Sequence, residues 1–406
     1  MLRIGITGAN FIEWGGGLDF LRTVASSLYA TSVPIELHFL APGTGPRASL
    51  YDVTRLLRAA VAKNILGRKV ATSHAPSRAD LHRAIQSFDV PIEFHNIDIG
   101  MNALAGRAKH LSLDVLLPSF VPLPFGRDLP WLGYIYDFQH RYLPQFFTEK
   151  ERKQRDCAFQ SMLSRAPGVI VNAQMVASNI KEFFPNTQAA VFTLPFSAAP
   201  SHKWFDLDDA PVREKYNITN RYFIICNQFW QHKDHSTAFD AFDEFIRRYG
   251  YADIDLVCTG ATGDFRSVDY FKSLIEKLRE KGIEKRVHIL GMIPKNEQIA
   301  LMKGAIGLIQ PTLFEGGPGG GAAYDAVSLG VPAIISDIPV NLEIIGEELV
   351  SFFRSRDPMS LVGEMQNCFK YSTQNKPGFD RLIEKGRVRR TRCGNVLLEA
   401  IDFVRR

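Results

Sequence analysis

Residues 314–325 read FEGGPGGGAAYD and place five glycines between Glu315 and Asp325. Glycine loses the most backbone entropy on folding, so this density in an ordered segment needs a structural or functional reason. The preceding GLIQPT predicts a buried strand, and the following AAYDAVSLG predicts a short helix that stops at Gly330. The glycines would then lie at a helix N-terminus, where unpaired amide groups can bind an anion.

The two carboxylates would flank a cradle of the size of a diphosphate. A nucleotide's phosphates would contact the glycines, its ribose diol would bind Asp325, and the transferred group would be held by Glu315, because carboxylates accept hydrogen bonds from hydroxyl groups. The alternative is a buried turn in which Glu315 forms a salt bridge. The donor-binding residues predicted from this segment are Glu315, Gly319, Gly320, Gly321, Ala322 and Asp325.

Short apolar runs alternate with amphipathic segments along most of the chain. This pattern is typical of parallel sheets covered by helices, and it occurs twice, so we expect an α/β fold with two doubly wound Rossmann-like domains. Strands are predicted at residues 2–7, 35–42, 114–120, 131–138, 168–173, 222–229, 254–260, 287–293, 307–312 and 332–337. Residues 194–211 have the composition of a linker. The predicted units are residues 1–196, residues 212–385 and a terminal helix at 388–406 that is able to pack back on the first domain.

A second glycine cluster follows the first predicted strand. After LRIGIT, the segment Trp14-Gly-Gly-Gly-Leu18 opens an amphipathic helix at the carboxyl edge of a sheet, where open α/β sheets bind ligands. Gly16 and Gly17 are therefore further candidates for donor binding. The G-x-G-x-x-G spacing of a dinucleotide site is missing, and a simple chain turn is the alternative.

The composition predicts a globular protein with a large core, since 46% of its 406 residues are hydrophobic and 22% are charged. Its five cysteines have no C-x-x-C spacing, which argues against a cysteine zinc site or a disulfide framework and suits a reducing compartment. Neither a signal peptide nor a membrane span is expected, so the predicted location is the cytoplasm. No cofactor and no metal site are predicted.

The net charge of +5 is unevenly distributed along the chain. The segment Arg47 to Arg83 contains eight lysines and arginines against two aspartates. Such a basic segment could contact an anionic membrane, a nucleic acid or a phosphorylated acceptor, and a solvated helix face is the alternative. Because aromatic residues are not interleaved with these charges, we expect no nucleic-acid partner.

The glycine-rich segment is similar to a known family motif. Glu315, the glycines, Asp325 and the following AVSLGVPAIISD resemble the E-x7-E region of retaining, nucleotide-sugar-dependent glycosyltransferases of family 4, which have the GT-B fold. The second acid is an aspartate here, and the spacing is E-x9-D. The resemblance implies two domains facing a central cleft, with the donor against the second domain and the acceptor entering from the first.

Three further segments resemble the same family. Residues 227–235 (NQFWQHKDH) are similar to its G-R-x-x-x-x-K motif, with Lys233 at the lysine that neutralises the donor diphosphate and Gln228 at the arginine; His232 and His235 are candidates to assist Lys233. Residues 134–140 (YIYDFQH) resemble a His-Asp strand end on the acceptor side, with Asp137 at the aspartate and Tyr136 at the histidine. His140 could supply the imidazole instead, and a structural histidine is the alternative. Residues 291–297 resemble the loop under the nucleotide base. The resemblance implies Lys233, Glu315, Asp137 and His140 as catalytic candidates, and it adds Gln228 and Ile293 to the donor-binding candidates.

Taken with the resemblance, these residues predict transfer of a hexose-type sugar from a nucleoside diphosphate to a hydroxyl of a glycan or lipid-linked acceptor, with retention. Metal-independent transfer is expected, because the D-x-D at Asp253 and Asp255 is better explained as solvent-facing alternation in a strand. The alternatives are a nucleotide-sugar epimerase of the same architecture, an NAD-dependent oxidoreductase and a non-enzymatic basic nucleic-acid-binding protein.

Overall fold

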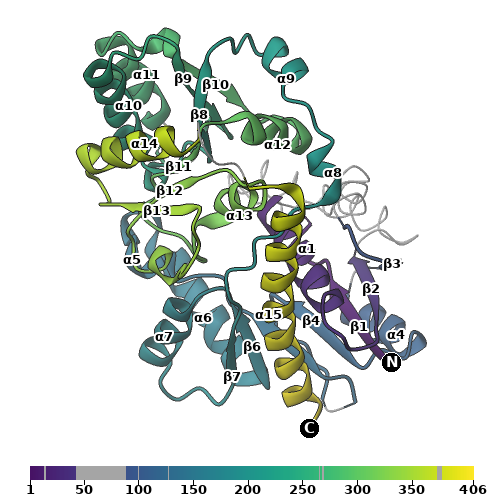
Figure 1. Cartoon of the computed structure of the whole chain (residues 1–406). Coiled ribbons are helices and arrows are strands. Elements are labelled where there is room, and N and C mark those ends of the chain that lie inside the picture. The colour runs from purple at the N-terminus through teal and green to yellow at the C-terminus, as the bar shows by residue number, and fades with distance from the viewer. Residues whose placement is uncertain are drawn as a thin grey trace.

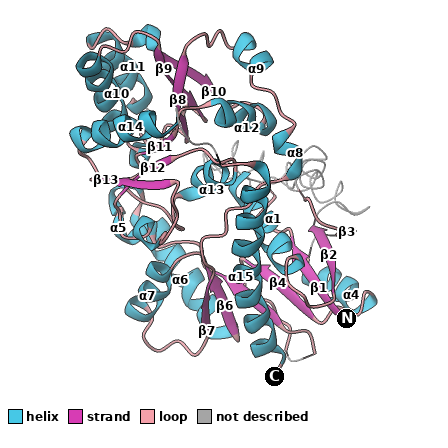
Figure 2. Ribbon diagram, viewed as in Figure 1, coloured by secondary structure: helices cyan, strands magenta, loops and turns pink. Residues whose placement is uncertain are grey.

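The computed structural model contains two parallel β-sheets, each at the centre of an α/β unit (Figures 1 and 2). It describes residues 1–12, 15–42, 88–98, 100–126, 128–264, 266–267, 269–372 and 377–406. The first sheet has the order β3-β2-β1-β4-β5-β6-β7. Its strands are β1 (Leu2–Thr7), β2 (Ile35–Pro42), β3 (Glu93–Ile97), β4 (Val115–Ser119), β5 (Trp131–Tyr134), β6 (Gly168–Val171) and β7 (Ala190–Thr193).

Helices cover both faces of the first sheet, because side chains alternate between the faces along each buried strand. In β2, Leu37 and Phe39 pack in the core cluster shared with α1, whereas Leu40 packs in the cluster shared with α6 and α7. The helices are α1 (Gly15–Tyr29), α4 (Met101–His110), α5 (Gln139–Tyr142), α6 (Glu149–Arg165) and α7 (Gln174–Phe183), with a 3₁₀ turn, η1, at Pro144–Phe146. α6 begins with a capping box formed by Thr148 and Glu151.

The second sheet has the order β10-β9-β8-β11-β12-β13. Its strands are β8 (Arg221–Cys226), β9 (Ile254–Thr259), β10 (Val287–Gly291), β11 (Leu308–Gln310), β12 (Ala333–Ser336) and β13 (Val350–Phe353). The helices of this part are α8 (His202–Phe205), α9 (Ala210–Lys215), α10 (His235–Tyr249), α11 (Tyr270–Glu280), α12 (Lys295–Gly304), α13 (Gly320–Ser328) and α14 (Pro358–Ser372), with 3₁₀ turns η2 (Gln231–Lys233), η3 (Glu284–Arg286) and η4 (Asn341–Glu343). In both sheets the strand order reverses at the centre, which makes each sheet doubly wound.

The last helix, α15 (Phe379–Arg405), returns to the first unit and runs beside α1 (Figure 1). Gly394 permits this close approach, because a Cβ at that position would lie 2.1 Å from the carbonyl oxygen of Ser27. Thr391 adds a hydrogen bond from its hydroxyl to the carbonyl of Ala30 at 3.1 Å. The helix begins before residue 388, where the sequence analysis placed its start. None of the helices that the structure describes is long and apolar enough to cross a membrane.

Candidate functional site

Two loops of the second sheet meet at the point where its strand order reverses. β8 and β11 are neighbours there, and their carboxyl ends lead into residues 227–234 and 311–319. The amide of Leu313 donates a hydrogen bond to the carbonyl of His232 at 2.8 Å, which ties the two loops together. Ligands of doubly wound sheets bind at this kind of position, because the loops on either side diverge.

Lys233 and Glu315 form an ion pair across these two loops. Their side chains are only 11% and 12% exposed, so the pair lies in a poorly solvated environment. The Nε2 group of Gln310 also donates to Glu315 Oε1 at 3.1 Å, and Asn227 Nδ2 donates to Gln310 Oε1 at 2.8 Å. The structure thus brings together a cation and a carboxylate that the sequence analysis assigned to the donor phosphate and the transferred sugar.

The two histidines beside Lys233 do not add positive charge to the site. Burial lowers the pKa of His232 to about 2 and that of His235 to about 3, so both rings are neutral at physiological pH. His235 stacks on Phe229 with ring centroids 4.1 Å apart. Any assistance that these histidines give to Lys233 therefore comes from neutral rings, and Lys233 is the cation of this loop.

The glycine-rich segment forms the N-terminus of α13. Gly319 and Gly320 adopt left-handed conformations with φ of 70° and 60°, which explains two of the glycines. The side chain of Asn341 accepts a hydrogen bond from the Gly319 amide at 2.8 Å and fixes the start of the helix. A Cβ at Gly321 would meet no atom within 4 Å, so the helix end is open on that side, whereas Ala322 is buried. The Gly320 amide donates to the Gly317 carbonyl at 3.3 Å, so the amides of Gly321 and Ala322 are the first-turn groups that could receive an anion.

Other glycines of this segment are explained by contact with the first unit. A Cβ at Gly316 would lie 2.5 Å from the carbonyl oxygen of Tyr136, and one at Gly317 would lie 3.0 Å from Cβ of Asn172. The contact at Gly316 is closer than a side chain allows, and the contact at Gly317 is so tight that Asn172 would have to move by a few tenths of an ångström. The segment is glycine-rich partly because its backbone presses against the loops that follow β5 and β6, a reason that local sequence patterns do not show.

A second contact between the units lies close by. The carboxylate of Glu343 in η4 accepts hydrogen bonds from the amides of Gln174 and Met175, each at 2.7 Å. These amides belong to the first turn of α7, where an anionic side chain is favourable. Glu343 therefore caps a helix of the other unit and links the two units.

Asp325 is buried in an ionic cluster that joins the two units. Its Oδ2 is 2.5 Å from Nζ of Lys295 at the start of α12, and its Oδ1 is 3.9 Å from Nη2 of Arg22 in α1. Asp19, one turn before Arg22, also approaches Lys295 Nζ at 3.5 Å. Burial raises the pKa of Asp325, and although burial alone would lower that of Lys295, Asp19 and Asp325 hold it above its usual value. Arg22, Asp19 and Lys295 were not predicted, since the cluster combines three separate helices.

A family model matches the part of the chain that forms the second sheet and most of its helices. Residues 208–376 match the profile of the family described as Glycosyl transferases group 1. The structure is similar to sucrose-phosphate synthase from Thermosynechococcus elongatus, with a TM-score of 0.60, 14% identity and coverage of 98% of this chain and 97% of that chain. It is also similar to HepE from Anabaena in complex with UDP and glucose, with a TM-score of 0.58, 12% identity and coverage of 100% and 96%.

The fold is GT-B. A glycosyltransferase from Rickettsia africae is similar at a TM-score of 0.58, with 12% identity and coverage of 99% of this chain and 95% of that chain. No curated protein matches the sequence. At these identities the structural likeness concerns the fold alone, and it confirms the predicted fold class of two parallel α/β domains.

In the GT-B frame, the two acceptor-side candidates of the first domain lie in different surroundings. Asp137 accepts a hydrogen bond from the amide of Gln139 at 2.9 Å, and burial raises its pKa, while nearby Arg155 opposes the shift. His140 is buried, its Nε2 lies 2.9 Å from Asp156 Oδ1, and its ring packs near three phenylalanine rings. His140 thus has the contacts of a structural histidine, whereas Asp137 lies next to the Tyr136 carbonyl that Gly316 approaches.

The remaining donor-side candidates have known positions, but within the described part of the chain no hydrogen bond or ion pair links them to Lys233 or Glu315. Gly16 and Gly17 lie in the first turn of α1, the helix that also carries Asp19 and Arg22. Gln228 is exposed, and Ile293 packs at the edge of a core cluster. Their roles in donor binding stay predictions. The basic segment Arg47 to Arg83 lies outside the residues that the structure describes, so its contact with an anionic membrane is also a prediction.

The interpretation of the D-x-D residues needs a correction. Asp253 is exposed and pairs with Arg221, but Asp255 is buried in β9, which lies between β10 and β8. Although burial alone would raise its pKa, hydrogen bonds from His288, Arg286 and Asn220 hold the pKa of Asp255 below its usual value. Asp255 is therefore a structural carboxylate inside the second sheet and does not face solvent.

Proposed function

We propose that this protein is a glycosyltransferase that moves a hexose-type sugar from a nucleoside diphosphate sugar to a hydroxyl acceptor. The observation that carries the proposal is that the Lys233–Glu315 pair and the open N-terminus of α13 lie together at the switch point of the domain that matches Glycosyl transferases group 1. We further propose that it belongs to family 4, retains the anomeric configuration, and acts in the cytoplasm in glycan, polysaccharide or glycolipid assembly.

The proposed chemistry centres on charge that develops on the leaving diphosphate. The ammonium group of Lys233 and the first-turn amides of α13 stabilise this charge, and preorganised donors of this kind contribute strongly where water is excluded. Glu315 accepts hydrogen bonds from the transferred sugar while it keeps Lys233 oriented. Asp325 accepts hydrogen bonds from the ribose, and Lys295 then retains Asp19 as a second partner. Gly16 and Gly17 of α1 approach the diphosphate from the facing domain.

A panel of nucleotide sugars tested by thermal shift checks the donor assignment. A matched donor stabilises only the folded form, so we expect one nucleotide sugar, with UDP-glucose in the panel, to raise the melting temperature in a concentration-dependent way. The Asp325→Asn variant should show a smaller shift with the same donor. Failure of every nucleotide sugar to stabilise the wild-type protein would contradict the proposal. Conversion of the donor without any acceptor would instead favour the epimerase.

We also propose that transfer does not need a metal ion, because Lys233 and the α13 amides supply positive charge and Asp255 is engaged inside the sheet. The initial rate with a matched donor and acceptor should be the same, within about twofold, in chelator and in added manganese. The measurement is product formation by mass spectrometry. A rate that vanishes in chelator and returns with manganese would show that the leaving group is activated by a metal.

A further inference from the structure

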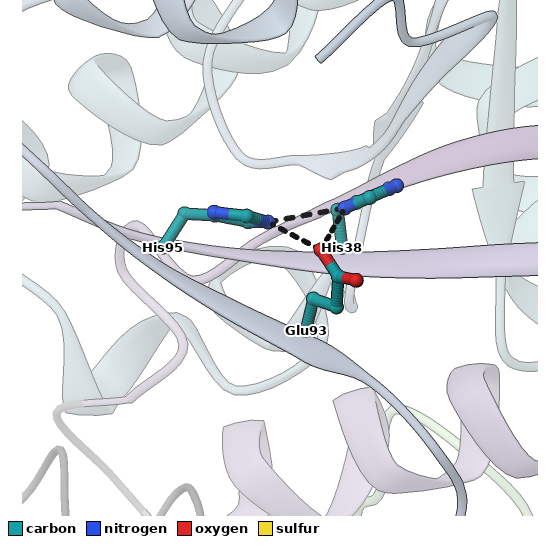
Figure 3. A group of neighbouring side chains, drawn as sticks. All are labelled: His38, Glu93 and His95. Carbon is teal, nitrogen blue, oxygen red and sulfur yellow. Dashed lines mark hydrogen bonds and ion pairs between the residues drawn. The ribbon is translucent and has the colours of Figure 1, made fainter.

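Three side chains of the first domain converge on one face of its sheet, away from the candidate donor site. They are His38 in β2 and Glu93 and His95 in the edge strand β3 (Figure 3). In the parallel register His38 lies beside Glu93, and Leu40 lies beside His95. Because alternate residues of a strand share a face, all three side chains lie on the face where Leu40, Ile97 and Ala108 of α4 pack.

The three nearest polar atoms form a triangle of the size that a metal ion requires. His38 Nδ1 and His95 Nε2 are 3.0 Å apart, and Glu93 Oε2 lies 3.5 Å from the first and 3.6 Å from the second. A circle through these atoms has a radius of about 2.0 Å, so a single ion can lie at Zn–N and Zn–O bonding distance from all three. Figure 3 shows the two rings and the carboxylate directed at one another.

A hydrogen bond between the two rings explains only part of this arrangement. A single proton can join His38 Nδ1 to His95 Nε2, and a carboxylate oxygen has no proton to give. Glu93 Oε2 then lies beyond hydrogen-bond distance from one ring and at its limit from the other. A cation among the three atoms would accept a lone pair from each of them.

The surroundings of His38 match those of a metal-bound histidine. Its side chain is fully buried, and Nε2 has no hydrogen bond and lies 3.2 Å from Glu36 Oε1. Glu36 is itself held by Arg3, whose Nη2 donates to Oε1 at 3.1 Å. Histidine ligands usually direct their second ring nitrogen at a carboxylate, which fixes the tautomer and the ring orientation. A small rotation of the ring would align this contact while Nδ1 bonds the ion.

We propose that His38, Glu93 and His95 bind a divalent transition-metal ion of the zinc class. Two imidazoles favour zinc over magnesium or calcium, which prefer oxygen ligands. Glu93 is 64% exposed, so the ion can enter from solvent, and water completes its coordination. The bound ion would fasten the edge strand β3 to β2. The sequence analysis predicted no metal because these ligands come from different strands and form no short motif.

The experiment uses the full-length protein without a histidine tag. Stripped protein is titrated with cobalt, followed by visible absorption, and cobalt is then displaced by zinc; magnesium is the negative control. We expect one equivalent of cobalt with the absorption of a tetrahedral site, displacement by zinc and no effect of magnesium. Absence of cobalt and zinc binding to the wild-type protein would overturn the proposal.

Variants test which residues hold the ion. His95→Ala and Glu93→Gln should each abolish the cobalt spectrum, and the exposed position of Glu93 keeps its variant folded. Glu36→Gln should weaken zinc binding about 10- to 100-fold, which is the usual cost of losing an outer carboxylate. His202→Ala removes an exposed histidine of α8 and should bind zinc as the wild type does. Unchanged zinc affinity in Glu93→Gln, or an equal loss in His202→Ala, would show that the ion binds elsewhere.

Discussion

Replacing Lys233 by alanine is expected to lower turnover by about 10²- to 10³-fold, the usual cost of removing one preorganised group that stabilises charge in the transition state. The reason is that His232 and His235 are neutral and that residues 227–234 contain no other lysine or arginine, so the loop has no second cation to replace Lys233. The measurement is kcat with saturating donor, after the donor panel has identified the sugar nucleotide.

The loss of a buried cation also affects folding, and this effect has to be separated from catalysis. Removing one partner of a buried pair leaves the other charge uncompensated. The double variant Lys233→Ala/Glu315→Gln removes that charge, so it should recover most of the melting temperature lost in Lys233→Ala and remain inactive. Lys272→Ala, which breaks an exposed pair with Glu276 in the same domain, should leave both quantities unchanged. Wild-type turnover in the folded double variant would remove Lys233 from the mechanism.

The fold could be predicted from the sequence where strands are buried on both faces. Each of the predicted strands overlaps an observed strand, and the three that were missed, β3, β7 and β13, all lie at a sheet edge, as does β10, which was predicted. An edge strand has one neighbour, so its residues are less buried and its apolar pattern is weaker. The residues of β7 are all partly exposed, and β3 carries Glu93, His95 and Asn96 among five residues.

The same reasoning explains the error at Asp255. Alternation of polar and apolar residues predicts a strand with one solvated face, but β9 lies between β8 and β10 and is buried along its whole length. The buried carboxylate of Asp255 is stabilised by hydrogen bonds from His288 in the neighbouring strand β10 and from Arg286 in the turn before β10. A single sequence does not identify such partners, since they are distant along the chain.

In the candidate site, too, residues in short sequence motifs were predicted and partners distant along the chain were not. Lys233 and Glu315 were found because each lies in a short segment with a recognisable spacing, and adjacent strands then bring them together. The partners of Asp325 were not found, because Arg22 and Lys295 belong to helices far apart in the sequence. The glycine segment combines a local and a distant cause. Gly319 and Gly320 are needed for their left-handed backbone conformations, whereas Gly316 is needed because the other domain approaches it closely.

Replacing Gly316 by alanine is expected to lower kcat/KM about 10²-fold, although the residue has no side chain to contribute. The added Cβ would lie 2.5 Å from the Tyr136 carbonyl oxygen and 3.0 Å from Cβ of Asp137. Neither a backbone carbonyl nor a Cβ can rotate away, so the two domains must separate locally. Misplacement of catalytic groups by about 1 Å can cost a factor of this size. Glu315, the adjacent residue, would be displaced from groups that reach the site from the first domain.

The matched control is Gly363→Ala in α14, where a Cβ would meet no atom within 4 Å and alanine is the better helix former. This variant should keep wild-type kcat/KM and melt at the same temperature or slightly higher. Small-angle scattering should show a larger radius of gyration for Gly316→Ala than for Gly363→Ala. If the two domains moved as one rigid body, overpacking at Gly316→Ala would instead lower the free energy of unfolding by about 1–3 kcal/mol and leave the radius of gyration unchanged. Equal kcat/KM in the two variants would mean that the contact between Gly316 and Tyr136 is not needed for the reaction, and that the domains act from a more open arrangement.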